Sequence, residues 1–216
     1  MKRYVKELIL VLLLLVPYVY LATFWNQLPE QVPTHFDADG NPDDYSSRYF
    51  LLFLPAGVGI ITYLVLRIIP ILDPKKKIQL MGEKYYSFRF VFSIFFALFA
   101  CYLLYITKQG GMDSPNILIG IIAAMVAVMG NYFQAIRPNY FIGIRTPWTL
   151  ESERVWKNTH RLGGRLWMGG GILLLILCIV LRNSTAISIA AVAVMCIIVL
   201  IPVIYSYVDY KRLRTN

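Results

Sequence analysis

Long apolar segments alternate with short polar ones along the whole chain. Six segments contain few charged residues, and each is close to the roughly 20 residues that a helix needs to cross the ~30 Å hydrocarbon core of a bilayer. They are residues 6–25, 49–71, 87–107, 116–136, 166–182 and 186–208. Tyr20–Phe24 offers no small-residue cleavage site, so we expect the first segment to be retained rather than cleaved as a signal peptide. The pattern predicts an all-α integral membrane protein, with a single six-span domain over residues 1–216.

The composition agrees with this class. Hydrophobic residues make up 58% of the chain and charged residues 15%, and the mean hydropathy is +0.60. A soluble domain usually carries about 25% charged residues. Cys101, Cys178 and Cys196 all lie inside apolar segments, where cysteine is typically a small packing residue. Intrinsic disorder and a secreted disulfide scaffold are therefore excluded.

The positions of the basic residues predict an orientation. The formal net charge is +9. If the N-terminus is cytoplasmic, all but three of the 21 lysine and arginine residues fall on the inner side, the exceptions being Arg48, Lys108 and Arg182. The positive-inside rule then predicts that both termini are cytoplasmic. This distribution explains the net charge through contact with the lipid bilayer, so we expect no direct nucleic-acid partner.

Little in the apolar segments predicts transport or catalysis. Glu7, Arg67, Arg89 and Asp209 each lie within a turn or two of a segment end, where we expect their side chains to extend toward the interface. The lack of charge near the bilayer midplane argues against ion-coupled transport. The two histidines fall on opposite sides, and no catalytic or metal-binding motif occurs, so we expect no enzymatic activity, metal or cofactor.

Two features of the fourth segment predict helix packing. Asn131 and Gln134 lie near its inner end, where their side chains are expected to form hydrogen bonds between helices. Gly120 and Ala124 stand one turn apart, a spacing typical of closely packed membrane helices. We therefore expect the face that carries Gly120 to pack against a neighbouring helix of the same subunit, with a dimer face as the alternative.

The first outer loop, residues 26–48, is acidic, with five acids against one base. Pro29 and Pro33 favour extended backbone before them and Asp39–Pro42 is a turn sequence, so we expect a compact, strand-like lid. Its spacing of acids does not match an EF-hand, which leaves at most a loose surface calcium site. The loop is either an ordered connection or a negatively charged docking surface. The candidate docking residues are His35, Phe36, Asp37, Asp39, Asp43 and Asp44.

The large inner loop, residues 137–165, is predicted to contain an amphipathic helix. We expect Thr149 to cap its start, and Gly163 and Gly164 to end it. Helical spacing puts Val155, Thr159, Leu162 and Leu166 on one face, and Arg154, Lys157 and Arg161 on a second face about a quarter-turn away. Such a helix lies in the cytoplasmic interface, and its tryptophans, Trp148 and Trp156, are expected at headgroup level.

The two loops also resemble a known family. The outer stretch Leu28-Pro29-x-x-x-Pro33-x-His35-Phe36, with Gly40 and Asp43-Asp44-Tyr45 after it, is similar to a segment of the SdpI family of bacterial immunity proteins. The inner stretches around 130–132, 137–150 and 152–164 are similar too, as is Leu72-Asp73-Pro74, so that the resemblance covers nearly the whole chain. The inner motif residues are Asn131, Arg137, Pro138, Asn139, Gly143, Arg145, Thr146, Pro147, Trp148, Arg154, Trp156, His160, Arg161, Gly163 and Gly164.

The resemblance implies a multi-pass protein of the bacterial cell membrane that protects its host from a secreted toxic peptide acting on membranes. For some members it also implies that a cytoplasmic transcriptional repressor is held at the membrane, with the inner motif as the candidate contact. Within that motif, the planar guanidinium of Arg145 is suited to tie loop carbonyls or a carboxylate together. Two rival interpretations stay open: a transporter or exporter of a peptide or lipid, and a membrane-embedded enzyme.

Overall fold

The computed structural model describes residues 3–37, 39–112, 114–181 and 183–215. This part of the chain contains six helical segments long and apolar enough to cross a membrane, which confirms the predicted number. They are Tyr4–Gln27, Phe50–Leu72, Glu83–Gln109, Pro115–Phe133, Glu153–Val180 and Thr185–Arg214. Lys2 and Arg182, two of the charges behind the predicted orientation, lie outside the described residues. The orientation and the single domain stay predictions.

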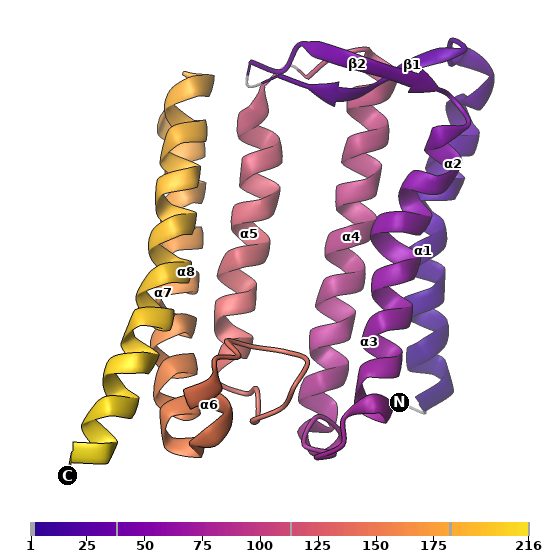
Figure 1. Ribbon diagram of the computed structural model, residues 1–216. Coiled ribbons are helices and arrows are strands. Elements are labelled where there is room, and N and C mark those ends of the chain that lie inside the picture. Colours follow the sequence, from indigo (N-terminus) through magenta and orange to yellow (C-terminus); the bar gives the residue numbers. More distant parts are fainter. Residues whose placement is uncertain (1–2, 38, 113, 182, 216) are drawn as a thin grey trace. The chain divides into compact units, whose positions relative to one another are not determined.

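The chain forms two compact units, and the first comprises the residues up to Ile68 together with Tyr86–Pro115. Its elements, seen in Figure 1, are α1 (Arg3–Phe24), a 3₁₀ turn η1 (Trp25–Gln27), β1 (Gln31–Phe36), β2 (Pro42–Ser47), α2 (Phe50–Pro55), a π-helical segment η2 (Ala56–Ile60), α3 (Ile61–Leu72) and α4 (Glu83–Gln109). β1 and β2 form an antiparallel hairpin, which realises the strand-like lid expected for the acidic loop. We call residues 31–47 the acidic hairpin.

The second span is helical throughout but not uniformly α-helical. Pro55 has no N–H to donate to the preceding turn, and the chain widens into the π-helical segment η2 directly after it. Gly59 in η2 is buried, and a Cβ there would lie 3.2 Å from Cδ2 of Leu14 in α1. The glycine therefore allows η2 to approach α1 closely.

The acidic hairpin is joined to the helices by a hydrophobic cluster. Val32 of β1 is fully buried, and Leu28 just before the strand is nearly so. They pack with apolar side chains from three helices, so one face of the hairpin belongs to the core of this unit. The cluster consists of Leu21, Phe24, Leu28, Val32, Leu51 and Leu104.

The second unit comprises Ile69–Tyr85 and Asn116–Asn216. Its elements are a 3₁₀ turn η3 (Gln79–Met81), α5 (Pro115–Phe133), the short helix α6 (Pro147–Glu151), α7 (Glu153–Val180) and α8 (Ser184–Thr215). Asp73, in the connection after α3, is buried and accepts backbone N–H groups of Lys75 and Ile78 at 3.3 and 3.0 Å. We call residues 137–152, which join α5 to α7, the motif loop.

Glycines bring α5 and α7 into backbone contact. A Cβ on Gly130 would lie 2.6 Å from the carbonyl oxygen of Gly164, and a Cβ on Gly171 would lie 2.6 Å from that of Ala123. By contrast, a Cβ on Gly120 would meet none of the described atoms within 4 Å. The expected helix packing at Gly120 is therefore not found within this unit, because the close approach of α5 occurs at Gly130 and beside Ala123, and a dimer face at Gly120 stays a prediction. Asn131, at the end of α5, is exposed.

The fifth helix corrects a second expectation. Residues 150–180 were expected to form an interfacial helix, a stop at Gly163 and Gly164, and then a span from 166. Instead α7 is continuous from Glu153, is capped by Ser152 rather than Thr149, and carries both glycines in its buried interior. Both lack a side chain where neighbours press on α7, since a Cβ on Gly163 would lie 3.2 Å from Cδ1 of Ile144. Tertiary packing thus overrides the tendency of glycine to end a helix.

Candidate functional site

The tip of the acidic hairpin is held by one carboxylate. Asp37 accepts hydrogen bonds from the backbone N–H groups of Asn41 and Asp39 at 2.8 and 2.9 Å, and from the Asn41 side chain at 3.2 Å. The bonds from Asn41, backbone and then side chain, hold the pKa of the Asp37 carboxyl below its usual range. Asp37 therefore stays ionised at neutral pH, and its predicted place at the docking surface is also that of a turn-forming residue.

The other predicted residues of the hairpin lie along its exposed side. His35 and Asp43 pair across the two strands, with 2.6 Å between Nδ1 and Oδ1, and their side chains are 69% and 46% exposed. Asp44 is exposed and accepts the N–H of Tyr45, and Asp39 is exposed at the turn. Phe36 is half-buried at the end of β1. The structure thus brings all six candidate residues together on one hairpin, four of them in its strands and Asp37 and Asp39 in its turn.

Two hydrogen bonds fix the hairpin to α4 and to the residues after it. The hydroxyl of Thr107 donates to the carbonyl of Pro33 at 3.3 Å, and the N–H of Met112 donates to the carbonyl of Gly40 at 3.1 Å. Gly40 has φ of +90°, and a Cβ there would lie 2.6 Å from the Met112 carbonyl oxygen, so no other residue fits without a shift. The lid is therefore held in one position within its unit.

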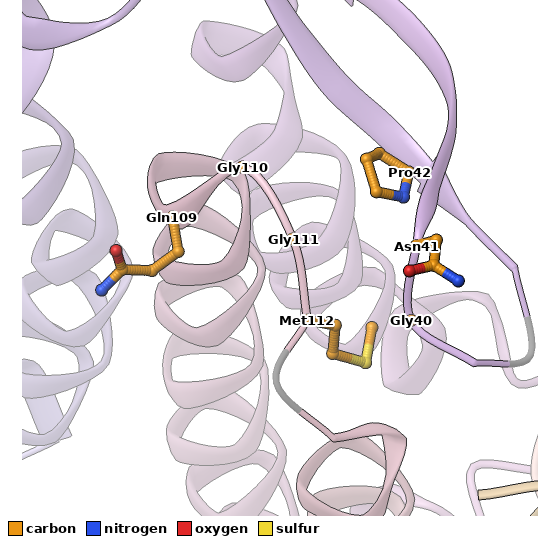
Figure 2. A pocket seen from close by; sticks show the side chains of 7 residues that line it. All are labelled: Gly40, Asn41, Pro42, Gln109, Gly110, Gly111 and Met112. Carbon is orange, nitrogen blue, oxygen red and sulfur yellow. The ribbon is translucent and has the colours of Figure 1, made fainter.

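A cleft of about 440 Å³ lies between the hairpin tip and the chain that follows α4. Figure 2 shows Asn41 and Pro42 on one wall and Met112 on the other, while the side chain of Gln109 points away. The remaining walls are backbone of Gly40, Gly110 and Gly111. Their N–H groups already donate within the chain, Gly40 to Asp37, Gly110 to Thr107 and Gly111 to Ile106, so the glycines shape the cleft rather than offer free donors to a ligand.

In the motif loop, Asn139 organises the turn after α5. Its side chain donates to the carbonyls of Arg137 and Ile142 at 2.7 and 3.1 Å, and accepts the N–H groups of Phe141 and Ile142 at 2.8 and 2.7 Å. Only 1% of Asn139 is exposed. A buried amide that satisfies four backbone groups is a structural residue, because its loss would leave those groups unpaired.

The motif loop ends in the short helix α6, and Trp148 of this helix attaches it to α8. Thr146 caps α6, and its side chain and that of Thr149 form a reciprocal capping box, with Pro147 at the first helical position. Trp148 donates its indole N–H to the hydroxyl of Ser206 in α8, and its ring packs against Tyr207 at 5.2 Å between centroids. Thr149 is therefore a partner in the cap of α6, and the loop is fastened to α8.

His160 and Trp156 of α7 form hydrogen bonds with backbone groups at the two ends of the chain segment 136–144. The ring of His160 donates from Nδ1 to the Trp156 carbonyl at 2.8 Å and accepts the N–H of Ile144 on Nε2 at 3.0 Å, which defines a neutral imidazole. Trp156 is 2% exposed and donates its indole N–H to the Ile136 carbonyl at 2.8 Å. Trp156 is therefore a buried support of the loop, and its expected place at headgroup level stays a prediction. Gly143 has φ of +109° and leaves room for the His160 ring.

Burial divides the predicted inner motif into two sets. Asn139, Trp156, His160, Gly163 and Gly164 are buried and hold the loop. The exposed members include four arginines, of which Arg145 donates to the Tyr140 carbonyl and so ties one loop carbonyl rather than several. The exposed arginines are Arg137, Arg145, Arg154 and Arg161, and Pro138 is half-buried.

An exposed basic row runs along α7. Arg154, Lys157, Arg161 and Arg165 follow one another at intervals of three or four residues and therefore lie on one face over roughly 16 Å. Within the described part of the chain none of the four forms an ion pair. The row is thus the exposed part of the inner motif with the highest density of charge.

A charged cluster in the first unit was missed by the sequence reasoning. Glu7 of α1 forms a bidentate pair with Arg89 of α4, at 2.8 and 2.9 Å, and a further pair with Arg67 of α3 at 2.9 Å. Tyr63 donates its hydroxyl to the same carboxylate at 2.7 Å. Arg89 does not extend to the interface, since only 9% of its side chain is exposed. The sequence contained one signal of this cluster, because Glu7, Arg67 and Arg89 each lie a similar distance from the end of their predicted spans.

Two parts of the chain match the models of protein families. Residues 135–206, which include the motif loop, match the model of the SdpI/YfhL protein family, and residues 12–59, which include the acidic hairpin, match a domain of unknown function (DUF1648). No solved structure matches the chain.

The chain is also similar in sequence to two individual proteins. The chain is 22% identical to the immunity protein SdpI of Bacillus subtilis (strain 168) over 210 residues, 97% of this chain and 98% of the relative. It is 47% identical over 49 residues to an uncharacterised protein of Archaeoglobus fulgidus, an overlap of 23% of this chain and 27% of the relative. The predicted resemblance to the SdpI family is thereby confirmed, and with the six spans it identifies a multi-pass bacterial membrane protein.

Proposed function

Because this chain resembles the SdpI family along nearly its whole length, we propose that it is a membrane immunity protein that protects its host from a secreted, membrane-active toxic peptide. The observation that carries the proposal is the acidic hairpin. A mere connection between two spans needs no ordered sheet, yet this one is buried on one face, bonded to α4 and capped by Asp37. It presents a fixed group of exposed carboxylates.

The chemistry of the hairpin favours a cationic peptide as the ligand. Residues 26–48 carry a local balance of five acids against one base, and Asp39, Asp43 and Asp44 are all exposed. Like charges fixed on a small surface attract an oppositely charged ligand and accelerate its capture. The neighbouring cleft, lined by the hairpin tip and by residues 109–112, leaves room beside the hairpin for part of a peptide.

Neutralising the exposed acids tests this function. Asp39→Asn, Asp43→Asn and Asp44→Asn are combined, and Asp37 is kept because it forms the turn. Cells that express each variant are challenged with a panel of synthetic cationic membrane-active peptides at two ionic strengths. We expect the triple variant to protect about tenfold less well at low ionic strength, with a smaller difference at 0.15 M salt, where charges are screened within about 8 Å.

The matched control is Glu153→Gln, which removes an exposed acid from the second unit. It should protect as the wild type does at equal amounts of membrane protein. If the triple variant protects as well as the wild type at both ionic strengths, the acids do not attract the peptide and are only solvent-exposed residues of a turn.

The basic row on α7 supports the second part of the proposal, in which a cytoplasmic transcriptional repressor is held at the membrane. Arg154→Glu with Arg161→Glu reverses two charges of the row and leaves the buried residues that hold the motif loop in place. We expect this variant to lose membrane recruitment of fluorescently labelled repressors from neighbouring genes and to keep its peptide protection. The measurement is the share of fluorescence at the membrane.

The control for the repressor experiment is Lys76→Glu with Lys84→Glu, the same change of charge at two exposed lysines that do not belong to α7. It should recruit normally. Recruitment and protection that fall together in step with the amount of protein would make the row a packing or lipid-facing element.

A further inference from the structure

The cluster around Glu7 is short of one negative charge. Its carboxylate accepts four donors: Nη1 of Arg89 on one oxygen, and Nη2 of Arg89, Nη1 of Arg67 and the Tyr63 hydroxyl on the other. Four donors fill the lone-pair sites of a carboxylate. One carboxylate therefore serves two guanidinium groups, and the cluster keeps a formal charge of +1.

The cluster lies at a depth where this charge matters. Glu7 comes four residues after the start of α1, Arg67 five residues before the end of α3, and Arg89 six residues after the start of α4. At 1.5 Å per residue, all three are roughly 6–9 Å along a helix from its end. With each span centred on a hydrocarbon core of about 30 Å, that depth is close to the border between the core and the headgroups, where an unbalanced charge is costly and a lipid phosphate is near.

The three side chains differ in exposure. The side chain of Arg89 is 9% exposed and that of Glu7 is 19% exposed, so both are held inside the unit. The side chain of Arg67 is 49% exposed and uses Nη1 for Glu7. Within the described residues no other partner of the Arg67 guanidinium occurs. Glu7 thus orients the Arg67 side chain, and the remaining N–H donors of the Arg67 guanidinium face outward.

We propose that Arg67, oriented by Glu7, binds the phosphate of an anionic phospholipid headgroup and so balances the charge of the Glu7–Arg67–Arg89 cluster. A guanidinium matches two oxygens of a phosphate with parallel hydrogen bonds. Free inorganic phosphate offers the same oxygens, and the experiment separates the two sources. The site is independent of the hairpin and of the motif loop.

The test uses the purified full chain in detergent, with bound lipid counted by native mass spectrometry. Phosphatidylglycerol, phosphatidylcholine and inorganic phosphate are titrated separately. We expect the wild type to prefer phosphatidylglycerol to phosphatidylcholine, and Arg67→Gln to bind phosphatidylglycerol about tenfold more weakly. Arg67→Lys keeps the charge without the fork and should fall between the two.

Two further variants keep the test decisive. Arg165→Gln removes an exposed cation of the second unit and should bind as the wild type does. Glu7→Gln keeps a side-chain oxygen that can accept the Arg67 N–H and orient it, and raises the charge of the cluster. In the fraction that elutes as folded protein it should therefore bind phosphatidylglycerol at least as well as the wild type. A purely structural role of the cluster predicts weaker binding for Glu7→Gln instead.

The possible results divide clearly. Inorganic phosphate that binds with the same dependence on Arg67, without a lipid preference, supports the anion site and identifies free phosphate as its occupant. Equal phosphatidylglycerol binding by the wild type, Arg67→Gln and Arg67→Lys overturns the proposal, as does equal weakening by Arg67→Gln and Arg165→Gln.

Discussion

Replacing Gly130 with alanine should prevent most of the protein from folding in the membrane. The added Cβ would lie 2.6 Å from the Gly164 carbonyl oxygen and also against the backbone of Met168, so α5 and α7 would have to separate. Rigid backbone cannot yield as a side chain can, so we expect a cost at the upper end of the roughly 1–3 kcal/mol that overpacking typically causes. The measurement is the amount of monodisperse protein extracted from membranes, together with its thermal unfolding.

The same helix supplies the control. Gly120→Ala adds the same methyl group to α5 at a position where it meets no described atom within 4 Å, and alanine is the better helix former. A second pair repeats the comparison on α7, where Gly171→Ala should be severe and Gly169→Ala mild. If Gly120→Ala and Gly130→Ala accumulate equally, α5 and α7 do not touch at these glycines.

Removing the carboxylate of Glu7 should cost at least as much as the glycine substitutions. Glu7→Leu leaves the guanidinium of Arg89, with 9% of its side chain exposed, without its bidentate partner. Breaking one partner of a buried pair costs roughly 3–5 kcal/mol, because the remaining charge is desolvated and uncompensated. The expected result is a large fall in the free energy of unfolding of the purified protein.

A double variant distinguishes the lost pair from the lost side chain. Glu7→Leu combined with Arg89→Leu removes both charges, and apolar replacements of a buried pair are often nearly neutral. The double variant should therefore regain a large part of the stability that Glu7→Leu loses. A double variant as unstable as the single one would mean that Glu7 acts through packing rather than through its charge.

Hydropathy predicted the spans well because each apolar segment must satisfy its own backbone in lipid, whatever its neighbours do. The fifth span is the exception. Its first half, Glu153–Leu162, is polar on one face, and Gly163 and Gly164 follow it, so a local interpretation ends the helix there. What continues the helix is contact with Gly130 and Ile144, which are distant in sequence. Local patterns do not contain that information.

The residues of the two candidate sites were found, but not their roles. Asn139, Trp156 and His160 were marked as motif residues, and the structure places them inside the loop, where their hydrogen bonds go to backbone groups. The cluster around Glu7 escaped because its members are 60 and 82 positions apart. Each charge taken alone is typical of a helix end, and only the helix arrangement shows that they share one carboxylate.

The hydrogen bond between Thr107 and Pro33 also determines when the hairpin can be completed during biosynthesis. These residues are 74 positions apart, and Leu104, which completes the cluster beneath the hairpin, is nearly as far along the chain. At about 5–20 residues per second, a ribosome needs roughly 4–15 s between making the first strand and making its support on α4. During that interval the hairpin can form by itself but has nothing to rest on, since an isolated two-stranded sheet is marginal in water. The first loop is therefore completed only when the third span arrives.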